Sequence, residues 1–239
     1  MKVRAIFYGI VALAVLANCA FPVGAAAETT GEILEKDGAS WVEFAPEWGD
    51  PPAQDGFDAE LLRQARAARK EGSSVFRREV DSAAEAAELL GVPLLHSELL
   101  EKYADPQRQL EVCCRPSLAL QSATLDLQYG TGECLFILRA TVAWEDGYRC
   151  LYDYAIPDAA ESFLYTTGAG QEVEVFRLLD EEERPVRMCT VFRHGDAVYQ
   201  LFAVSDGCSV PDAGGKYRPS DGVPEERFLR VLDSLETAA

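Results

Sequence analysis

Residues 134–144 read CLFILRATVAW, a segment that is apolar on both faces over much of its length. A strand with one face in water alternates apolar and polar residues, whereas a strand buried on both faces reads as a nearly continuous apolar run. Glycine-containing turns, Gly130-Thr131-Gly132 and Glu145-Asp146-Gly147, bound the segment on both sides. We therefore predict that residues 134–144 form a central strand of a sheet.

The neighbouring segments alternate with a period of two, which is typical of half-buried strands. Leu110, Val112 and Cys114 alternate with polar residues, and the same pattern recurs at 124–129. Gly195-Asp196 is typical of a two-residue hairpin turn between two more strands. Further strands are predicted at 148–156, 163–167, 172–179, 186–193 and 197–205.

Two helices are predicted before the strands. Asp58 is placed to cap a short helix that ends at Gly72. Ser82 and Glu85 form a capping box, in which hydroxyl and carboxylate satisfy exposed backbone N–H groups, and this second helix stops at Gly91. A short helical piece is also predicted between Ser97 and Tyr103.

A last helix is predicted to begin at Pro224, with an apolar stripe made of Phe228, Val231, Leu232 and Leu235. One sheet needs a cover for its apolar face, and the helices at the two ends of the domain are the available covers. The predicted fold class is therefore α+β, a single antiparallel sheet of about seven strands covered by N- and C-terminal helices.

The N-terminus has the features of an export signal. Lys2 and Arg4 precede a nearly continuous apolar run, and residues 25–27 are alanines, as at a signal-peptidase site. We expect cleavage after Ala27. Two alternatives remain open: the apolar stretch stays in a bilayer as an uncleaved anchor, or Cys19 is acylated as in a lipoprotein. Each alternative implies export, so the predicted localisation is extracytoplasmic, secreted or associated with the cell envelope.

The predicted organisation is a signal peptide at 1–27, a tether with a short helix at 28–74 and an α+β domain at 75–239. The whole chain carries a net charge of −18, and loss of Lys2 and Arg4 on cleavage leaves 20 basic against 40 acidic residues. So acidic a chain repels nucleic acid and anionic headgroups. We therefore predict no nucleic-acid partner, and contact with the membrane only through an N-terminal anchor.

Sequence motifs for catalysis are weak. The only histidines are His96 and His194, and no nucleophile signature accompanies either. The acidic clusters at 180–183 and 145–146 lack the alternating ligands and glycine bend of a calcium loop, and are interpreted as solvated turns. We predict no cofactor, no bound metal and no enzymatic activity. A secreted hydrolase using carboxylates and a thiol-redox protein are kept as alternatives.

Cysteines carry the clearest chemical signal. After removal of Cys19 with the leader, an even number remains in an exported chain, which favours disulfide bonds. Zinc sites and thioredoxin-like sites favour C-x-x-C spacing, which is absent from the sequence. The structural disulfide candidates are Cys113, Cys114, Cys134, Cys150, Cys189 and Cys208.

The strand pattern narrows how these cysteines pair. Adjacent strand residues point to opposite faces, so Cys114 is expected towards the core and Cys113 on the other face, each with its own partner. Simple hairpin registers place Cys134 opposite about Gln128 and Cys189 opposite about Phe202. Bridges must then join strands distant in sequence, or tie a strand to the loop that holds Cys208. We predict that Cys113 pairs with Cys189.

Four segments together resemble a domain family of unknown function that is common in exported, lipoprotein and anti-sigma-factor-like proteins of Gram-positive bacteria. They read FRREVDSAAEAAELLGVPLL, GQEVEVFRLLD, VFRHGDAVYQLFAVS and EERFLRVLDSLE. The matching motif residues are Ser82, Glu85, Ala86, Leu89, Leu90, Gly91, Gly195, Tyr199, Leu201, Ser234 and Leu235. The resemblance implies an architecture similar to lipoprotein-carrier-like half-barrels, which hold apolar groups between a sheet and helices.

Export, a sheet covered by helices and the weak catalytic motifs together predict a non-enzymatic binding or interaction domain that is stabilised by disulfides. The expected partner is a peptide, an envelope protein or an apolar group.

Overall fold

The computed structural model describes residues 32–36, 39–43, 56–102, 106–144, 161–205, 208–211 and 215–237. The predictions for the signal peptide at 1–27, for lipidation of Cys19, for Cys150 and for a strand at 148–156 concern residues outside these ranges.

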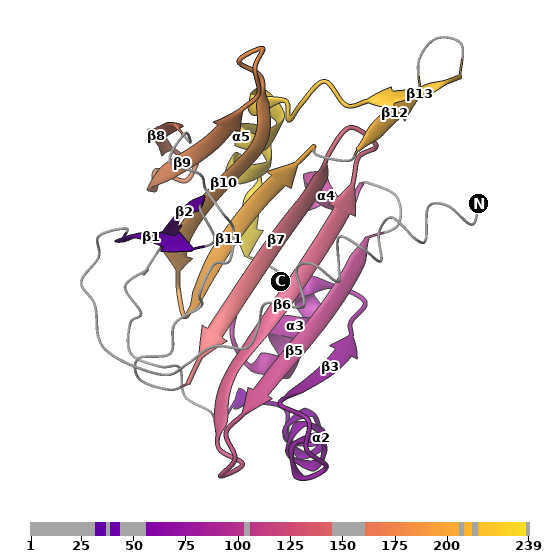
Figure 1. Ribbon diagram of the computed structural model, residues 1–239. Helices are drawn as coiled ribbons and strands as arrows, with labels where there is room; N and C mark the ends of the chain where they lie inside the picture. The colour runs from indigo at the N-terminus through magenta and orange to yellow at the C-terminus, as the bar shows by residue number, and fades with distance from the viewer. Residues whose placement is uncertain are drawn as a thin grey trace.

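One antiparallel sheet of eight strands dominates the molecule (Figure 1). Its strand order is β3-β5-β6-β7-β11-β10-β9-β8. The strands are β3 (Val75–Glu79), β5 (Gln107–Cys114), β6 (Leu120–Gly130), β7 (Leu135–Ala143), β8 (Glu161–Thr166), β9 (Glu172–Leu179), β10 (Pro185–His194) and β11 (Ala197–Val204). The α+β class is confirmed, and β7 is a central strand as predicted. Sequence analysis missed β3, an edge strand that pairs with β5.

The described part of the chain contains four α-helices, and they pack on one face of this sheet, which we call the helix face. Helices α3 (Ala83–Leu90), α4 (Glu98–Glu101) and α5 (Glu225–Asp233) lie behind the sheet in Figure 1. Helix α2 (Ala59–Lys70) packs beside β3 and β5. Phe57, Leu61 and Ala65 are buried in the same cluster as the strands, so the helix of the predicted tether is packed on the domain.

The predicted helix ends are confirmed by their hydrogen bonds. The Asp58 carboxylate accepts the N–H of Leu61 at 2.7 Å, and the Ser82 hydroxyl accepts the N–H of Glu85 at 3.0 Å. The Glu85 carboxylate in turn accepts the N–H of Asp81 at 2.6 Å. The bonds from Leu61 and Glu85 satisfy donors that the first turn of a helix leaves open. Asp81 lies one residue before the cap, so the second bond of the predicted capping box is made with Asp81 and not with Ser82.

Gly91 ends α3 in a left-handed conformation with φ 64° and touches the start of α2. A Cβ atom at this position would lie 2.3 Å from the carbonyl oxygen of Gly56. The N–H of Asp58 also donates to the carbonyl of Leu89 at 2.7 Å. Glycine is therefore required at Gly91 both by its backbone conformation and by the close approach.

Three short strand pairs accompany the sheet. They are β1 (Glu32–Lys36) with β2 (Ala39–Glu43), β4 (Leu95–Ser97) with β14 (Leu235–Thr237), and β12 (Ser209–Pro211) with β13 (Tyr217–Pro219). Leu235, predicted on the stripe of the last helix, lies instead in β14. The helix ends earlier because Ser234 caps it and its hydroxyl lies 2.6 Å from that of Ser97 in β4.

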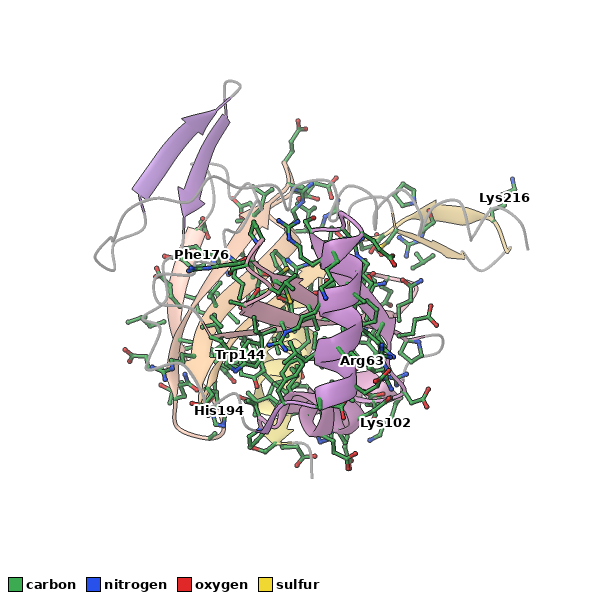
Figure 2. The ribbon with its side chains drawn as sticks, turned by 90° about the horizontal axis from the view of Figure 1, so that it is seen from below. Arg63, Lys102, Trp144, Phe176, His194 and Lys216 are labelled. Atoms are coloured by element: carbon green, nitrogen blue, oxygen red, sulfur yellow. The ribbon has the colours of Figure 1, made fainter. Side chains whose placement is uncertain are left out.

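The hairpin between β10 and β11 turns at Gly195-Asp196, as predicted, and His194 pairs with Ala197. Gly195 has a φ of 58°, the positive value that the first central residue of a type II′ turn needs. Figure 2 shows His194 at this end of the hairpin and Lys216 far away, beyond the β12–β13 pair.

The helix face holds the main core. Tyr129, Phe136, Leu138 and Phe228 are buried there together with alternate residues of the other strands. Phe57 and Trp144 belong to this cluster, with their ring centroids 5.3 Å apart in an edge-to-face arrangement. Among the described residues, no helix is both long and apolar enough to cross a membrane.

Candidate functional site: the front face of the sheet

The opposite face of the sheet, turned to the viewer in Figure 1, is called the front face here. Side chains alternate along each strand, so the neighbours of a front-face residue in its own strand point to the helix face. One part of the front face is apolar. Buried side chains there are Leu135, Ile137, Ala143, Cys189, Val198 and Phe202, which lie outside the helix-face cluster.

A second part of the front face is polar, and strand register arranges it in two rows that run across the sheet. The first row is Arg77, Glu111, Thr124 and Thr141, each directly opposite the next. Arg77 donates from Nε to the carboxylate of Glu111 at 2.6 Å, and the hydroxyls of Thr124 and Thr141 lie 3.1 Å apart. Each member of this row thus has a hydrogen-bonding partner in the row.

The second row is Gln109, Asp126, Arg139 and Gln200. Arg139 binds Asp126 with two parallel hydrogen bonds, Nε to Oδ1 at 2.6 Å and Nη2 to Oδ2 at 3.0 Å. The Asp126 side chain is only 6% exposed and that of Arg139 12%. A buried ion pair of this kind needs such two-pronged geometry to offset the loss of hydration.

Gln200, the last residue of this row, has a side-chain amide whose hydrogen-bonding capacity is not used by the described residues. The residue is 1% exposed. Among the residues that the structure describes, neither its amide nitrogen nor its amide oxygen has a hydrogen-bond partner. Ser122 on β6, directly opposite Ala143 on β7, likewise has a buried hydroxyl without a partner in the described part of the chain. Buried groups of this kind are rare and costly, which makes them indicators of a missing partner.

Two buried carboxylates lie on this face, as a hydrolase would require, but both are bound to arginine. Glu111 and Asp126 occupy diagonal positions on β5 and β6, because Asp126 faces Gln109. Diagonal neighbours in a sheet lie roughly 7–8 Å apart. Each carboxylate accepts hydrogen bonds from its guanidinium, Arg77 or Arg139. A general acid must donate a proton, whereas an ionised carboxylate only accepts.

The histidines are not brought together. His96 lies in β4, with Nε2 3.9 Å from a Glu236 carboxylate oxygen, and His194 is exposed at the β10–β11 turn. The cluster at 180–183 is a solvated turn, as interpreted from the sequence. Asp180 accepts backbone N–H groups and the side chain of Arg184, and the bonds from Arg184 lower the pKa of Asp180.

Cysteines occupy both faces. Cys114 is buried with Leu110 and Val112 on the helix face, as predicted, while Cys113 faces Ser122 on the front face. A β-bulge separates the two cysteines, since the register shifts between them. Cys114, Cys134 and Cys189 form no disulfide with another described residue in this structure. Burial raises the pKa of all three, to about 11 for Cys134 and to about 12 for Cys189.

The predicted register of Cys189 opposite Phe202 is confirmed. The register of Cys134 opposite about Gln128 is wrong, because the hairpin turns later. Gly130 pairs with Leu135, and the N–H of Thr131 donates to the carbonyl of Cys134 at 2.9 Å.

The predicted pairing of Cys113 with Cys189 is also wrong. Strands β5 and β10 are separated by β6, β7 and β11. At about 4.8 Å per strand their backbones lie on the order of 19 Å apart, well beyond the Cα separation of a disulfide.

Sequence reasoning missed the polar rows. Arg139 interrupts the apolar run at 134–144, and Gln200 interrupts another at 197–205. A single polar residue within a strand that is apolar on both faces was the available signal of a buried polar site. Only the strand register shows that Asp126, Arg139 and Gln200 are neighbours.

Within the described ranges, histidine, cysteine and acidic residues form no group of three or more that could hold a metal ion. No protein-family model, curated protein or solved structure matches this chain.

Proposed function

We propose that this chain is an exported, non-enzymatic binding or interaction domain, stabilised by disulfide bonding, whose ligand is a peptide or a segment of an envelope protein bound at the polar rows of the front face. The observation that carries the proposal is Gln200, whose buried amide has a donor and an acceptor that no described residue pairs with. A peptide backbone offers both complementary groups in one unit.

The front face also suits a peptide by its mixed chemistry. Ile137 and Phe202 lie beside the polar rows and supply buried apolar area, while Gln200 supplies directional hydrogen bonds. Binding sites commonly combine an apolar surface with a few polar groups that fix orientation. Extended peptides present both at once, through side chains and backbone.

An apolar group held between sheet and helices, as in the carrier-like half-barrel that the resemblance implies, is less favoured. Buried side chains such as Leu125, Leu138 and Phe228 occupy this layer as one continuous cluster. A ligand there would have to displace packed side chains. We place the ligand on the front face instead, because Gln200 carries an amide there whose donor and acceptor have no hydrogen-bond partner among the described residues.

The two enzymatic alternatives are less favoured for chemical reasons. Glu111 and Asp126 accept hydrogen bonds from arginine, whereas a general acid must donate a proton. Reactive redox cysteines have lowered pKa values, whereas burial raises the pKa of Cys114, Cys134 and Cys189. These shifts favour a structural role for the cysteines.

Selection from a random peptide library displayed on phage, followed by titration of a synthetic peptide, tests the binding proposal. The mature chain, residues 28–239, serves as bait. We expect saturable binding that is weakened at least tenfold, about 1.4 kcal/mol, by Gln200→Met and left unchanged by Gln64→Met on α2. Failure to enrich any peptide, or equal binding to all three proteins, would overturn the proposal.

Export is tested separately by expressing the full chain in a bacterium and measuring the intact mass of the product. Loss of residues 1–27 from an extracytoplasmic product is expected. A mass increase on a chain that begins at Cys19 would identify the lipoprotein alternative. A cytoplasmic chain of full length would contradict export.

A further inference from the structure

Cys134 lies at the end of the β7–β11 strand pair. It immediately precedes Leu135, which faces Val204, the last residue of β11. Its backbone carbonyl accepts the N–H of Thr131 at 2.9 Å, and its sulfur lies 3.4 Å from the Thr131 hydroxyl. The side chain is 1% exposed. The hairpin turn thus holds Cys134 firmly at this corner of the sheet.

Cys208 lies at the same corner of the sheet, just after the end of β11. After β11 ends, the N–H of Cys208 donates to the carbonyl of Ser205 at 2.9 Å, which closes a turn. Its thiol donates to the carbonyl of Val204 at 3.6 Å. The sulfur of Cys208 is therefore folded back onto the residue that faces Leu135.

The two cysteines are consequently near neighbours although they are far apart in the sequence. Residues directly opposite in an antiparallel pair have Cα atoms about 4.5–5.5 Å apart, and successive Cα atoms are about 3.8 Å apart. Cys134 is one residue from Leu135, and Cys208 contacts the partner of Leu135. Burial is the main cause that raises the pKa of Cys134, and the nearby Cys208 acts in the same direction.

Cys134 lies far from the other described thiols that are buried. Cys114 faces Leu120 at one end of β6, whereas Cys134 lies beyond Gly130 at the other end, roughly 33 Å away at about 3.3 Å per residue. Cys189 lies two strands from β7 and belongs to the front face. Cys208 is thus the partner that the fold offers to Cys134.

We propose that Cys134 and Cys208 form a disulfide that fastens the turn after β11 to the start of β7. The proposal deepens the proposed function, on which it rests for the oxidising compartment, by naming the bond that stabilises the exported domain. The bond locks the strand pair that carries Gln200 and Arg139, and so holds the front face in register.

The chemistry needs a two-electron oxidant, and a small-molecule disulfide such as oxidised glutathione supplies it. The Cys208 thiolate attacks the oxidant, which forms a mixed disulfide and releases one glutathione thiolate. The Cys134 thiolate then attacks the Cys208 sulfur, forms the new S–S bond and releases the second glutathione. Two protein thiols are oxidised, two protons leave, and one disulfide is reduced to two thiols.

The proposal is tested on the mature chain, residues 28–239, refolded in a buffer of reduced and oxidised glutathione and then alkylated. Cleavage before aspartate places Cys134 alone in 126–145, Cys208 alone in 206–211 and Cys189 alone in 180–195. Mass spectrometry without reductant is expected to find the first two peptides joined and to find the Cys189 peptide unjoined to either. Joining of the Cys134 peptide to any other cysteine, or alkylation of both Cys134 and Cys208, would overturn the proposal.

Variants keep the test decisive. The loop from Cys134 through Cys208 is 75 residues long, so the bridge should raise the thermal midpoint by roughly 5–15 °C over the reduced protein. Cys208→Ser, at a half-buried turn, should remove this difference in thermal midpoint between oxidised and reduced protein, and should leave Cys134 open to alkylation after unfolding. Cys189→Ala should keep the difference in thermal midpoint. An unchanged midpoint difference in Cys208→Ser would contradict the bridge. The refolding assay involves neither export nor peptide, so its failure is distinguishable from failure of the proposed function.

Discussion

Replacing Gln200 with methionine is expected to stabilise the protein, which is unusual for a substitution at a residue that is 1% exposed. The two amide atoms of Gln200 have no hydrogen-bond partner among the described residues, so the folded state bears the cost of removing them from water. Methionine has a similar length, no polar group to satisfy and enough flexibility to fit the same space.

The expected gain follows from that cost. A buried polar group without a partner destabilises a protein by about 1–3 kcal/mol. Recovery of this energy should raise the thermal midpoint by roughly 2–10 °C for a domain of this size. The same substitution removes the amide groups that the proposed ligand would bind, so the gain in stability is accompanied by a loss of ligand binding.

Urea unfolding of the reduced mature chain, followed by tryptophan fluorescence, measures the effect. The matched control is Gln64→Met on α2, where the amide donates to Glu60 at 2.9 Å on the surface. The control should change the free energy of unfolding by less than ~0.5 kcal/mol. A loss of stability in Gln200→Met larger than that in Gln64→Met would show that Gln200 is satisfied in the free protein and would refute the reasoning.

Three further predictions test the close approach at Gly91, the buried ion pair and the burial of Cys189. Gly91→Ala should lower the free energy of unfolding by about 2–4 kcal/mol, because the cost of a left-handed φ and the cost of a clash with Gly56 add up. The control Gly132→Ala has φ 86° and no atom within 4 Å of the added Cβ, so it should lose about half as much stability. Equal losses of the two variants in urea unfolding would contradict the clash. Asp126→Leu should cost about 3–5 kcal/mol by removing the two hydrogen bonds that Asp126 accepts from the buried Arg139. Adding Arg139→Met should recover part of the loss, and strictly additive losses would show that the pair is not coupled. Burial raises the pKa of Cys189 to about 12 from an ordinary 9.0. The free energy of unfolding that the protonated Cys189 thiol contributes is therefore fully present below pH 9 and is lost as the pH rises towards 12. Cys189→Ala should flatten the decline of stability between pH 9.5 and 11 by about 1.4 kcal/mol per pH unit, and identical slopes in urea titrations would contradict the burial of this thiol.

Much of the fold follows from local patterns. The apolar run at 134–144 correctly predicts a central strand, because a strand buried on both faces has no polar period. Asp58, Ser82 and Gly91 mark helix ends through their own hydrogen bonds and backbone preferences, which depend on few neighbours. These features are local, and a sequence carries them directly.

The candidate site was not predictable in the same way. Asp126 and Arg139 belong to neighbouring strands, and their pairing depends on a hairpin register that the turn at 131–134 shifts. Gln200 joins them only because β11 packs beside β7, a contact between segments about sixty residues apart. The edge strand β3 was missed because its alternation was short and full of arginine. Cross-strand neighbours depend on topology, which local periodicity does not specify.

The side-chain amide of Gln200 reports most directly on whether the front face binds a peptide. In a nitrogen–proton correlation spectrum its two signals are identified as the pair that disappears in Gln200→Met. We expect a selected peptide to shift these signals, and to shift backbone signals of β7 and β11 around Arg139 more than those of α2. Saturating peptide that leaves the Gln200 amide signals unmoved, or that shifts only residues outside the front face, would contradict a binding site at the polar rows.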